Sequence, residues 1–178
     1  MSESEVSLRL AKASDALCLS ALATQVFFET YATSGIRLAL VREAEAHFSL
    51  AAFNQRLGEP NSRTVLAELA GHLIAFAEVS LSTKHPLVPV GPAAELSRLY
   101  VQSPFLRRGV GRQLLAHAEA LASAKGASTL WLTAWVGNKR ALAFYASQGY
   151  EQLGSTDYTF EAECFENHLF AKAVRAET

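Results

Sequence analysis

Apolar and polar residues alternate at the start of the chain, and short apolar-rich segments recur further on, as expected of β-strands. Residues 6–11 alternate in this way. Residues 63–69 and 72–80 lie on either side of Ala70–Gly71, a dipeptide typical of a hairpin turn. Later strands are predicted over residues 95–101, 130–136, 150–160 and 164–172. The pattern predicts a mixed, mostly antiparallel sheet of about six or seven strands.

Other stretches carry apolar residues at helical spacing, over residues 16–31, about 36–57, 109–125 and 138–148. The second stretch is long enough for two short helices. Ser14 and Asp15 are expected to cap the first helix, while Gly126 and Gly149 end the last two. The order β-α-α-β-β-β-α-β-α-β-β is typical of an α/β (α+β) fold, a sheet flanked by about four helices.

Length and continuity favour one domain over residues 1–178. The segment 83–92 holds three of the five prolines and is expected to be a loop rather than a domain linker. Neither an internal repeat nor a change in composition marks a boundary elsewhere.

Composition and charge exclude several classes of protein. The net charge of −1 and a pI of about 6.5 argue against nucleic acid or an anionic membrane as partner. The chain starts without the basic and apolar regions of a secretory signal, and no stretch approaches a membrane span. The isolated Cys18 and Cys164 fit a reduced compartment, and the histidines lack metal-ligand spacing. We therefore expect a cytoplasmic protein without a metal.

The segment after the strand 95–101 has the chemistry of a phosphate site. The strand ends at Val101, and Gly109 and Gly111 open the next helix, so that main-chain N–H groups point out of the helix start. The helix dipole is positive there, and three formal charges come from Arg107, Arg108 and Arg112. This arrangement suits a pyrophosphate. A glycine-containing loop with solvated arginines is the alternative.

Two other nucleotide motifs fit less well. A dinucleotide fingerprint requires a third glycine where the chain has Leu114, and no acidic ribose partner is evident after a following strand. The Gly-Lys-Ser/Thr sequence of a Walker loop is absent.

A second motif follows about thirty residues later, formed by Asn138, Ala141, Phe144, Tyr145, Gly149 and Tyr150. Positions 138, 141 and 145 lie on one helix face because they are three and seven residues apart. Asn138 is placed to cap its own helix or to reach a ligand. The alternative is an amphipathic helix with a capping Asn and a core Tyr.

Together these motifs resemble those of the GCN5-related N-acetyltransferases, the GNAT superfamily. Leu106 stands where motif A of that family prefers Gln or Arg. The resemblance is clear over about residues 63–160 and implies the GNAT acyl-CoA N-acyltransferase fold with acetyl-CoA as cosubstrate. It places the cofactor between the strands 95–101 and 130–136, which splay apart in the family. The implied cofactor-binding residues are Leu99, Tyr100, Val101, Arg107, Arg108, Gly109, Val110, Gly111, Arg112, Asn138, Ala141 and Tyr145.

Within the family, the chain looks like the bacterial spermidine/spermine acetyltransferases of the PaiA type. Trp131 and Trp135 carry this likeness together with the two motifs, although tryptophans are also ordinary strand residues. A small-molecule amine such as a polyamine is accordingly one candidate acceptor.

By resemblance, the reaction is direct attack of an amine on the thioester in a ternary complex. Tyr145 is the expected general acid for the leaving thiolate, and Glu95 is a candidate base. A solvated carboxylate at the end of a strand is an equally good reading of Glu95. Acidic residues expected near an amine acceptor are Glu29, Glu43, Glu45, Glu78 and Glu95.

Alternatives remain open at this point. A non-catalytic acyl-CoA-binding domain would keep the cradle without the chemistry, although the presence of Tyr145 argues against it. An NAD(P)-dependent enzyme is disfavoured by Leu114. Within the acetyltransferases, the acceptor could instead be a protein N-terminus, an amino acid or an antibiotic amine. Exposed strand edges make a homodimer an option.

Overall fold

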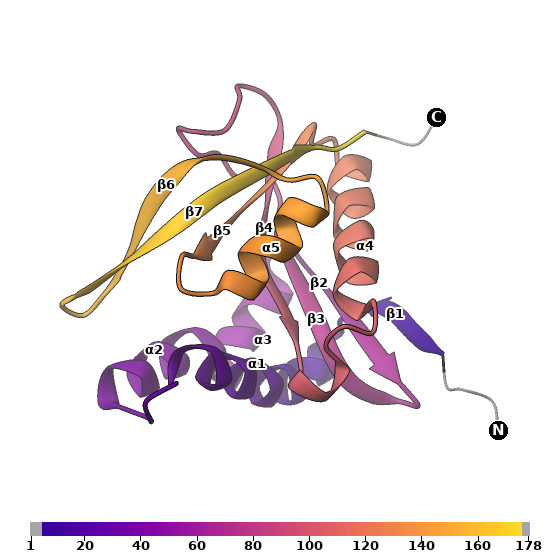
Figure 1. The fold of residues 1–178 in the computed structure, drawn as a ribbon. Coiled ribbons are helices and arrows are strands. Elements are labelled where there is room, and N and C mark those ends of the chain that lie inside the picture. The colour runs from indigo at the N-terminus through magenta and orange to yellow at the C-terminus, as the bar shows by residue number, and fades with distance from the viewer. Residues whose placement is uncertain (1–4, 176–178) are drawn as a thin grey trace. The chain divides into compact units, whose positions relative to one another are not determined.

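The computed structural model describes residues 5–175 as a mixed α/β fold (Figure 1). Its strands are β1 (Val6–Leu10), β2 (Ser62–Leu69), β3 (His72–Ser80), β4 (Ala93–Val101), β5 (Thr129–Trp135), β6 (Glu151–Phe160) and β7 (Glu163–Ala173). Its helices are α1 (Ala16–Tyr31), α2 (Leu38–Phe48), α3 (Leu50–Gly58), α4 (Val110–Ala124) and α5 (Lys139–Ser147), with short 3-10 turns at Ala13–Asp15 and Ser103–Phe105. The predicted strands and helices are confirmed, and the stretch 36–57 forms two helices.

The strands form one seven-stranded sheet in the order β1-β2-β3-β4-β5-β7-β6. β1 pairs with β2 antiparallel, β4 with β5 parallel, and β7 pairs antiparallel with both β5 and β6. The expected mixed, mostly antiparallel sheet is thereby confirmed. Two compact units, residues 5–78 with 98–117 and residues 79–97 with 118–175, are described in turn.

In the first unit, helices α1, α2 and α3 pack against one another. Aromatic rings dominate this core: Phe48 lies 5.4 Å from Phe27 and 5.9 Å from Tyr100, and Phe76 lies 5.4 Å from Tyr100. Phe27, Phe48 and Phe76 are buried. The contacts join α1, α2, β3 and β4, so that ring packing fixes the strand from which the predicted phosphate cradle departs.

Arg9 ties the edge strand β1 to its neighbours in this unit. Its guanidinium donates to both carboxylate oxygens of Asp15, at 2.8 and 2.9 Å, and to both oxygens of Glu68 on β2, at 3.0 and 2.7 Å. Two-pronged contacts of this kind fix geometry as well as adding energy. They hold β1 in the register that pairs Val6 with Leu69 and Leu10 with Val65.

The predicted cap of the first helix was wrong. Asp15 precedes α1 but makes no side-chain cap hydrogen bond to it. Its carboxylate instead accepts from the main-chain N–H of Lys12, at 2.7 Å, and from Arg9. The stronger partner is the guanidinium, which lies close only because β1 has folded against the turn.

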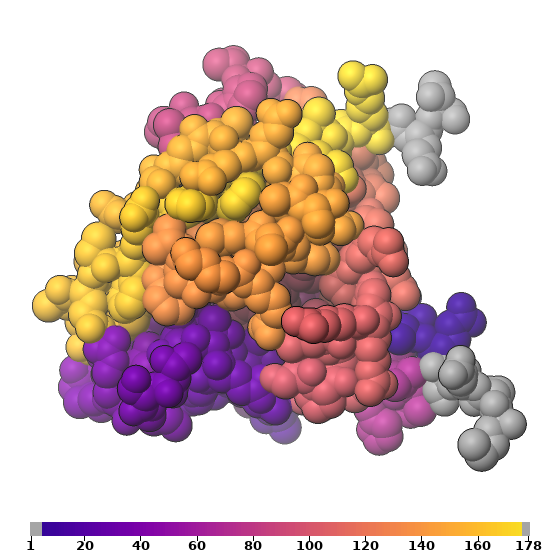
Figure 2. Space-filling view, in the orientation of Figure 1, coloured from indigo at the N-terminus to yellow at the C-terminus, as the bar shows by residue number. Residues whose placement is uncertain are grey.

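In the second unit, β5 pairs with β7 from Thr129↔Ala173 to Trp135↔Asn167. β6 and β7 form a long hairpin (Figure 1), with a register irregularity between Gln152 and Gly154. The outer surface of this hairpin is visible in orange and yellow in Figure 2. Leu130, Leu132 and Leu169 are buried and supply the core of this unit.

Both predicted helix-ending glycines are confirmed. Gly126 has φ 90°, and the N–H of Ala127 donates to the carbonyl of Ala122 at 3.0 Å. Gly149 has φ 84°, and the N–H of Tyr150 donates to the carbonyl of Tyr145 at 3.1 Å. Left-handed glycines followed by such bonds end helices because they satisfy carbonyls that the helix leaves open.

We predict that Asp15→Asn lowers the free energy of unfolding at neutral pH by about 1 kcal/mol, a modest value because Arg9 is partly exposed. The hydrogen bond from Arg9 lowers the pKa of the Asp15 carboxyl to about 2. Its stabilising contribution is therefore complete above about pH 4 and is lost as the pH falls through about 2. Urea unfolding of wild type and variant should thus differ near pH 7 and converge near pH 2.

The matched control is Asp157→Asn, at an exposed position of β6, which should leave the unfolding midpoint unchanged. A difference between Asp15→Asn and wild type that persists undiminished near pH 2 would show that the carboxylate charge is not the stabilising group.

Candidate active site

The predicted site residues divide between the two units. Leu99 to Arg112 belong to the first unit, and Glu95, Asn138, Ala141 and Tyr145 to the second. Each group is built up separately below.

In the first unit, a left-handed turn leads into α4. Arg107 has φ 60° and Gly109 has φ 80°, so that the chain twice enters a region that residues with a side chain avoid. A Cβ at Gly109 would meet nothing within 4 Å, so backbone conformation rather than crowding favours glycine there. The N–H of Gln113 then donates to the carbonyl of Gly109 at 3.0 Å and begins the helix ladder.

The start of α4 presents donors and positive charge. Its first N–H groups have no carbonyl acceptor within the helix, and the helix dipole is positive at this end. Val110 is 1% exposed, so its side chain lies in the core and only its main chain is available to a ligand. Arg107, Arg108 and Arg112 are exposed, and Arg108 lies over the ring of Phe105 at 5.6 Å. The turn and the helix start are compatible with the predicted cradle, which stays a prediction.

Side chains from α1 hold the loop before α4, which the sequence did not reveal. The Ser103 hydroxyl donates to Glu29 at 2.6 Å, and the Gln102 amide donates to the Gln25 side-chain oxygen at 2.8 Å. The main-chain N–H of Gln102 also donates to the carbonyl of Ile74 on β3 at 3.0 Å. Polar residues separated by 74 or more positions give no local signal of such contacts.

Two carboxylates proposed for the amine acceptor have other partners. Glu78 is 2% exposed and contacts Arg56 at 3.2 Å and Arg98 at 2.6 Å, so it is a buried ion-pair centre. Burial lowers the pKa of Arg56, against the opposing charge of Glu78. Glu29 accepts from Ser103, as described above.

The predicted cofactor residues of β4 in this unit are Leu99, Tyr100 and Val101, all half-buried. The Tyr100 ring packs against Phe48 and Phe76. A ligand at this strand would accordingly meet the main chain of Tyr100 rather than its ring.

In the second unit, Asn138 caps α5. Its side-chain oxygen accepts from the N–H of Ala141 at 3.1 Å, so the capping role is the one that the structure contains. Asn138 and Ala141 are both half-buried. One N–H at the α5 N-terminus is therefore satisfied from within the chain.

Tyr145 lies in an aromatic cluster on α5. It is 8% exposed, and its ring centroid lies 5.3 Å from Phe144, 5.9 Å from Tyr150 and 6.2 Å from Phe170. Three neighbouring rings pack around this phenol and restrict the tilt of its ring.

Glu95 is half-buried on β4 and is the direct partner of Trp131 in the parallel pairing with β5. Paired residues of neighbouring strands share a face of the sheet, so the carboxylate and the indole lie on the same side. Trp131 is 6% exposed, with the His85 ring 5.3 Å away. Glu95 thus lies on the same face of the sheet as the Trp131 indole, which packs near the His85 ring.

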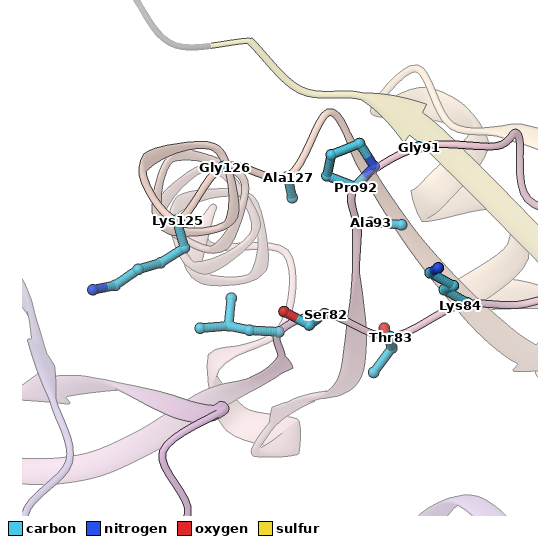
Figure 3. Close-up of a pocket in the computed structure, with 10 residues that line it drawn as sticks. Ser82, Thr83, Lys84, Gly91, Pro92, Ala93, Lys125, Gly126 and Ala127 are labelled. Atoms are coloured by element: carbon cyan, nitrogen blue, oxygen red, sulfur yellow. The ribbon is translucent and has the colours of Figure 1, made fainter.

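A separate cavity of about 250 Å³ lies in the second unit, away from these residues (Figure 3). The Lys125 side chain extends away from the other lining residues in Figure 3. The cavity is lined by Leu81, Ser82, Thr83, Lys84, Gly91, Pro92, Ala93, Lys125, Gly126 and Ala127. None of the predicted site residues contributes to it.

Neither a group of metal ligands nor a membrane-spanning helix is found in the part of the chain that the structure describes. Among residues 5–175, His, Cys, Asp and Glu side chains form no group of three that could hold a metal ion. No helix within the same range is long and apolar enough to cross a membrane.

Comparison with known proteins identifies the family. The model of the acetyltransferase (GNAT) family matches residues 27–150, and the chain belongs to this family. It is 31% identical over 107 residues to an uncharacterized N-acetyltransferase in the pepI 3′ region of Lactobacillus delbrueckii subsp. lactis. It is 33% identical over 104 residues to the N-alpha-acetyltransferase RimI of Mycobacterium tuberculosis.

These segments cover 60% and 58% of this chain and 60% and 61% of the two relatives, so the chain matches about three fifths of their length. Among solved structures, the fold is similar to the PaiA N-acetyltransferase of Thermoplasma acidophilum in complex with coenzyme A. The TM-score is 0.73, the identity is 19%, and the coverage is 95% of this chain and 99% of that one. The fold expected from the sequence is thereby confirmed.

We predict that Arg107→Gly is more stable than Arg108→Gly by about 1 kcal/mol, as read from urea midpoints. Glycine at 107 relieves the left-handed strain of an L-residue, a cost of about 1–2 kcal/mol, whereas both variants carry the same entropic cost of glycine. Arg108 is the matched control because it is adjacent, exposed and equally charged. Equal midpoints would mean that position 107 stores no strain.

Proposed function

We propose that this chain is an acetyl-CoA-dependent N-acetyltransferase that acts as one domain over residues 1–178. Membership of the GNAT family supports the proposal. The single observation that carries it is the start of α4, where a left-handed turn leads into a helix end beside three exposed arginines. The first N–H groups of a helix have no acceptor within it. This combination fits the pyrophosphate of a CoA thioester because it offers both directed donors and positive charge.

The proposed cofactor contacts follow from these two groups of residues. Main-chain N–H groups of Gly109, Val110 and Gly111 would bind phosphate oxygens, with the three arginines adding charge. Main-chain groups of Leu99, Tyr100 and Val101 would bind the acetyl carbonyl and the pantetheine amides. Ala141, a small residue on α5, would leave room for the pantetheine arm next to Asn138.

In the proposed reaction, the amine nitrogen attacks the thioester carbonyl carbon, and the carbon–sulfur bond breaks. A main-chain N–H of β4 would polarise the carbonyl oxygen. The hydroxyl of Tyr145 would donate its proton to the departing thiolate. Glu95 would take one proton from the ammonium, directly or through water, so that the free amine can attack. The second proton, lost by the nitrogen after the attack, would restore the hydroxyl of Tyr145.

For the acceptor we infer a primary amine. Glu95 beside Trp131 offers a carboxylate and an aromatic face, and an alkylammonium group is attracted by both. A small polyamine is the first candidate, supported by the likeness in sequence motifs to PaiA-type enzymes. A protein N-terminus is the second, supported by the similarity to the N-alpha-acetyltransferase RimI. An acceptor screen that follows release of free thiol separates the two.

We further infer a cytoplasmic location, consistent with the two isolated cysteines, both exposed. The exposed residues of the edge strand β6 offer a surface for a homodimer.

We predict that acetyl-CoA raises the melting temperature of the wild-type protein and that Gly109→Glu removes this shift. Binding to the native state alone stabilises it, by about 2.7 kcal/mol at a ligand concentration of one hundred times Kd. Glutamate would place a negative charge where the phosphates bind. Thermal unfolding with and without ligand measures the shift.

The matched control is Gly109→Ala, which carries the same left-handed strain without the charge and meets no neighbour within 4 Å. It should melt lower than wild type yet keep the ligand shift. An equal shift in Gly109→Glu and Gly109→Ala would refute the phosphate site.

We predict that Tyr145→Phe lowers kcat by about 10²–10⁴-fold, the range for loss of a positioned general acid. The ring contacts with Phe144, Tyr150 and Phe170 survive, so folding and acetyl-CoA affinity should be unchanged. Thiol release with the best amine of the screen gives kcat, and calorimetry gives the affinity. Wild-type turnover in this variant would show that another group protonates the thiolate.

A further inference from the structure

Tyr145 packs against a second tyrosine whose own position is unusually constrained. The ring of Tyr150 is 4% exposed and meets Tyr145 edge-on, with centroids 5.9 Å apart and planes at 65°. Its main-chain N–H donates to the carbonyl of Tyr145 at 3.1 Å. Its hydroxyl donates to Glu119 on α4 at 3.0 Å. Tyr150 is therefore held at both ends, and the face that it offers to Tyr145 is fixed.

Lys172 on β7 closes this arrangement. Its ammonium donates to the two carboxylate oxygens of Glu119, at 2.9 and 3.1 Å, and lies 5.5 Å from the centroid of the Tyr150 ring. Glu119 and Lys172 are 20% and 32% exposed, so the ion pair is partly shielded from water. Residues of α4, β7 and the end of α5 thus surround the Tyr150 ring. The Glu119 carboxylate accepts from both Tyr150 and Lys172.

Tyr150 does not compete with Tyr145 as an acid. Its proton is directed at Glu119, and burial, reinforced by the charge of Glu119, raises the pKa of Tyr150 well above its ordinary value. A hydroxyl that stays protonated and points at a carboxylate acts as an anchor.

We propose that Tyr150, Glu119 and Lys172 are positioning residues that hold the ring of Tyr145, and hence its hydroxyl, in the direction needed to protonate the leaving thiolate. The inference rests on the proposed acetyltransfer. A general acid requires tight placement, because an error of about 1 Å can cost up to a hundredfold in rate. Rotation about the ring axis leaves the Tyr145 oxygen in place, but a tilt of the ring displaces it. The hydrogen bond to Glu119 blocks the movement of Tyr150 that would allow such a tilt.

The first test is a kinetic cycle. Tyr150→Phe keeps the ring and removes only its anchor, so kcat should fall about tenfold while the Kd for acetyl-CoA stays constant. In the Tyr145→Phe background the same substitution should cause no further loss, since the group being positioned is gone. An equal loss in both backgrounds would overturn the proposal, because the effect would then not pass through the Tyr145 hydroxyl.

A pair of substitutions at Glu119 separates positioning from general destabilisation. Glu119→Gln retains an oxygen that accepts from Tyr150 and should keep nearly wild-type kcat, whereas Glu119→Leu should match Tyr150→Phe. The control Tyr158→Phe, at a tyrosine on β6 that is 43% exposed, should leave kcat unchanged. Equal loss in Glu119→Gln and Glu119→Leu would contradict the hydrogen-bonding role.

A second measurement is independent of turnover. The flip rate of the Tyr145 ring, measured by NMR, should rise in Tyr150→Phe and Glu119→Leu and remain at the wild-type value in Glu119→Gln. Unchanged flipping in all three variants would overturn the proposal. Failure of the proposed function appears differently, as no thiol release by wild-type protein with any amine, and leaves the ring-flip result standing.

Discussion

The N–H groups in the first turn of α4 have no acceptor within their own helix. The turn before the helix and its contacts set the surroundings of these N–H groups. The chain enters the helix through Arg107 and Gly109, both left-handed. Val110 is buried and anchors the turn from below, while Ser103 is held by Glu29 from α1. An anion that accepts from these N–H groups would complete the helix as a capping side chain does elsewhere.

Helix α5 begins with a residue whose side chain caps the helix. The side-chain oxygen of Asn138 at its N-terminus accepts from the N–H of Ala141, so one of the donors there is bonded from within the chain. The chemistry that we assign to α5 lies instead near its C-terminal end, on the Tyr145 ring. Gly149 turns the chain there, and Tyr150 folds back against the last turn of the helix. We therefore propose binding through the main chain for one helix and a side chain held in a fixed direction for the other.

The carboxylates with long-range partners show why residue type alone says little about an amine site. The exposed Glu29 accepts from Ser103, the buried Glu78 pairs with two arginines, and the half-buried Glu119 accepts from a tyrosine. Moving Glu78 away from its arginines would leave desolvated donors behind, because this carboxylate is 2% exposed. Glu95 shares a sheet face with an indole.

The sequence by itself determined the strands, the helices, the hairpin turn at Ala70–Gly71 and the glycines that end α4 and α5, because periodicity and left-handed turns are local properties. It also located the two motifs, since their spacing follows helix geometry. It gave Asp15 a cap hydrogen bond that the structure lacks, did not reveal the partners of Glu29 and Glu78, and left the capping role of Asn138 undecided. Only the tertiary structure decided these, and only it joined Glu119, Tyr150 and Lys172. The physical reason is that hydrogen-bond and ion-pair partners are chosen by proximity in space, to which residues dozens of positions apart contribute no local pattern.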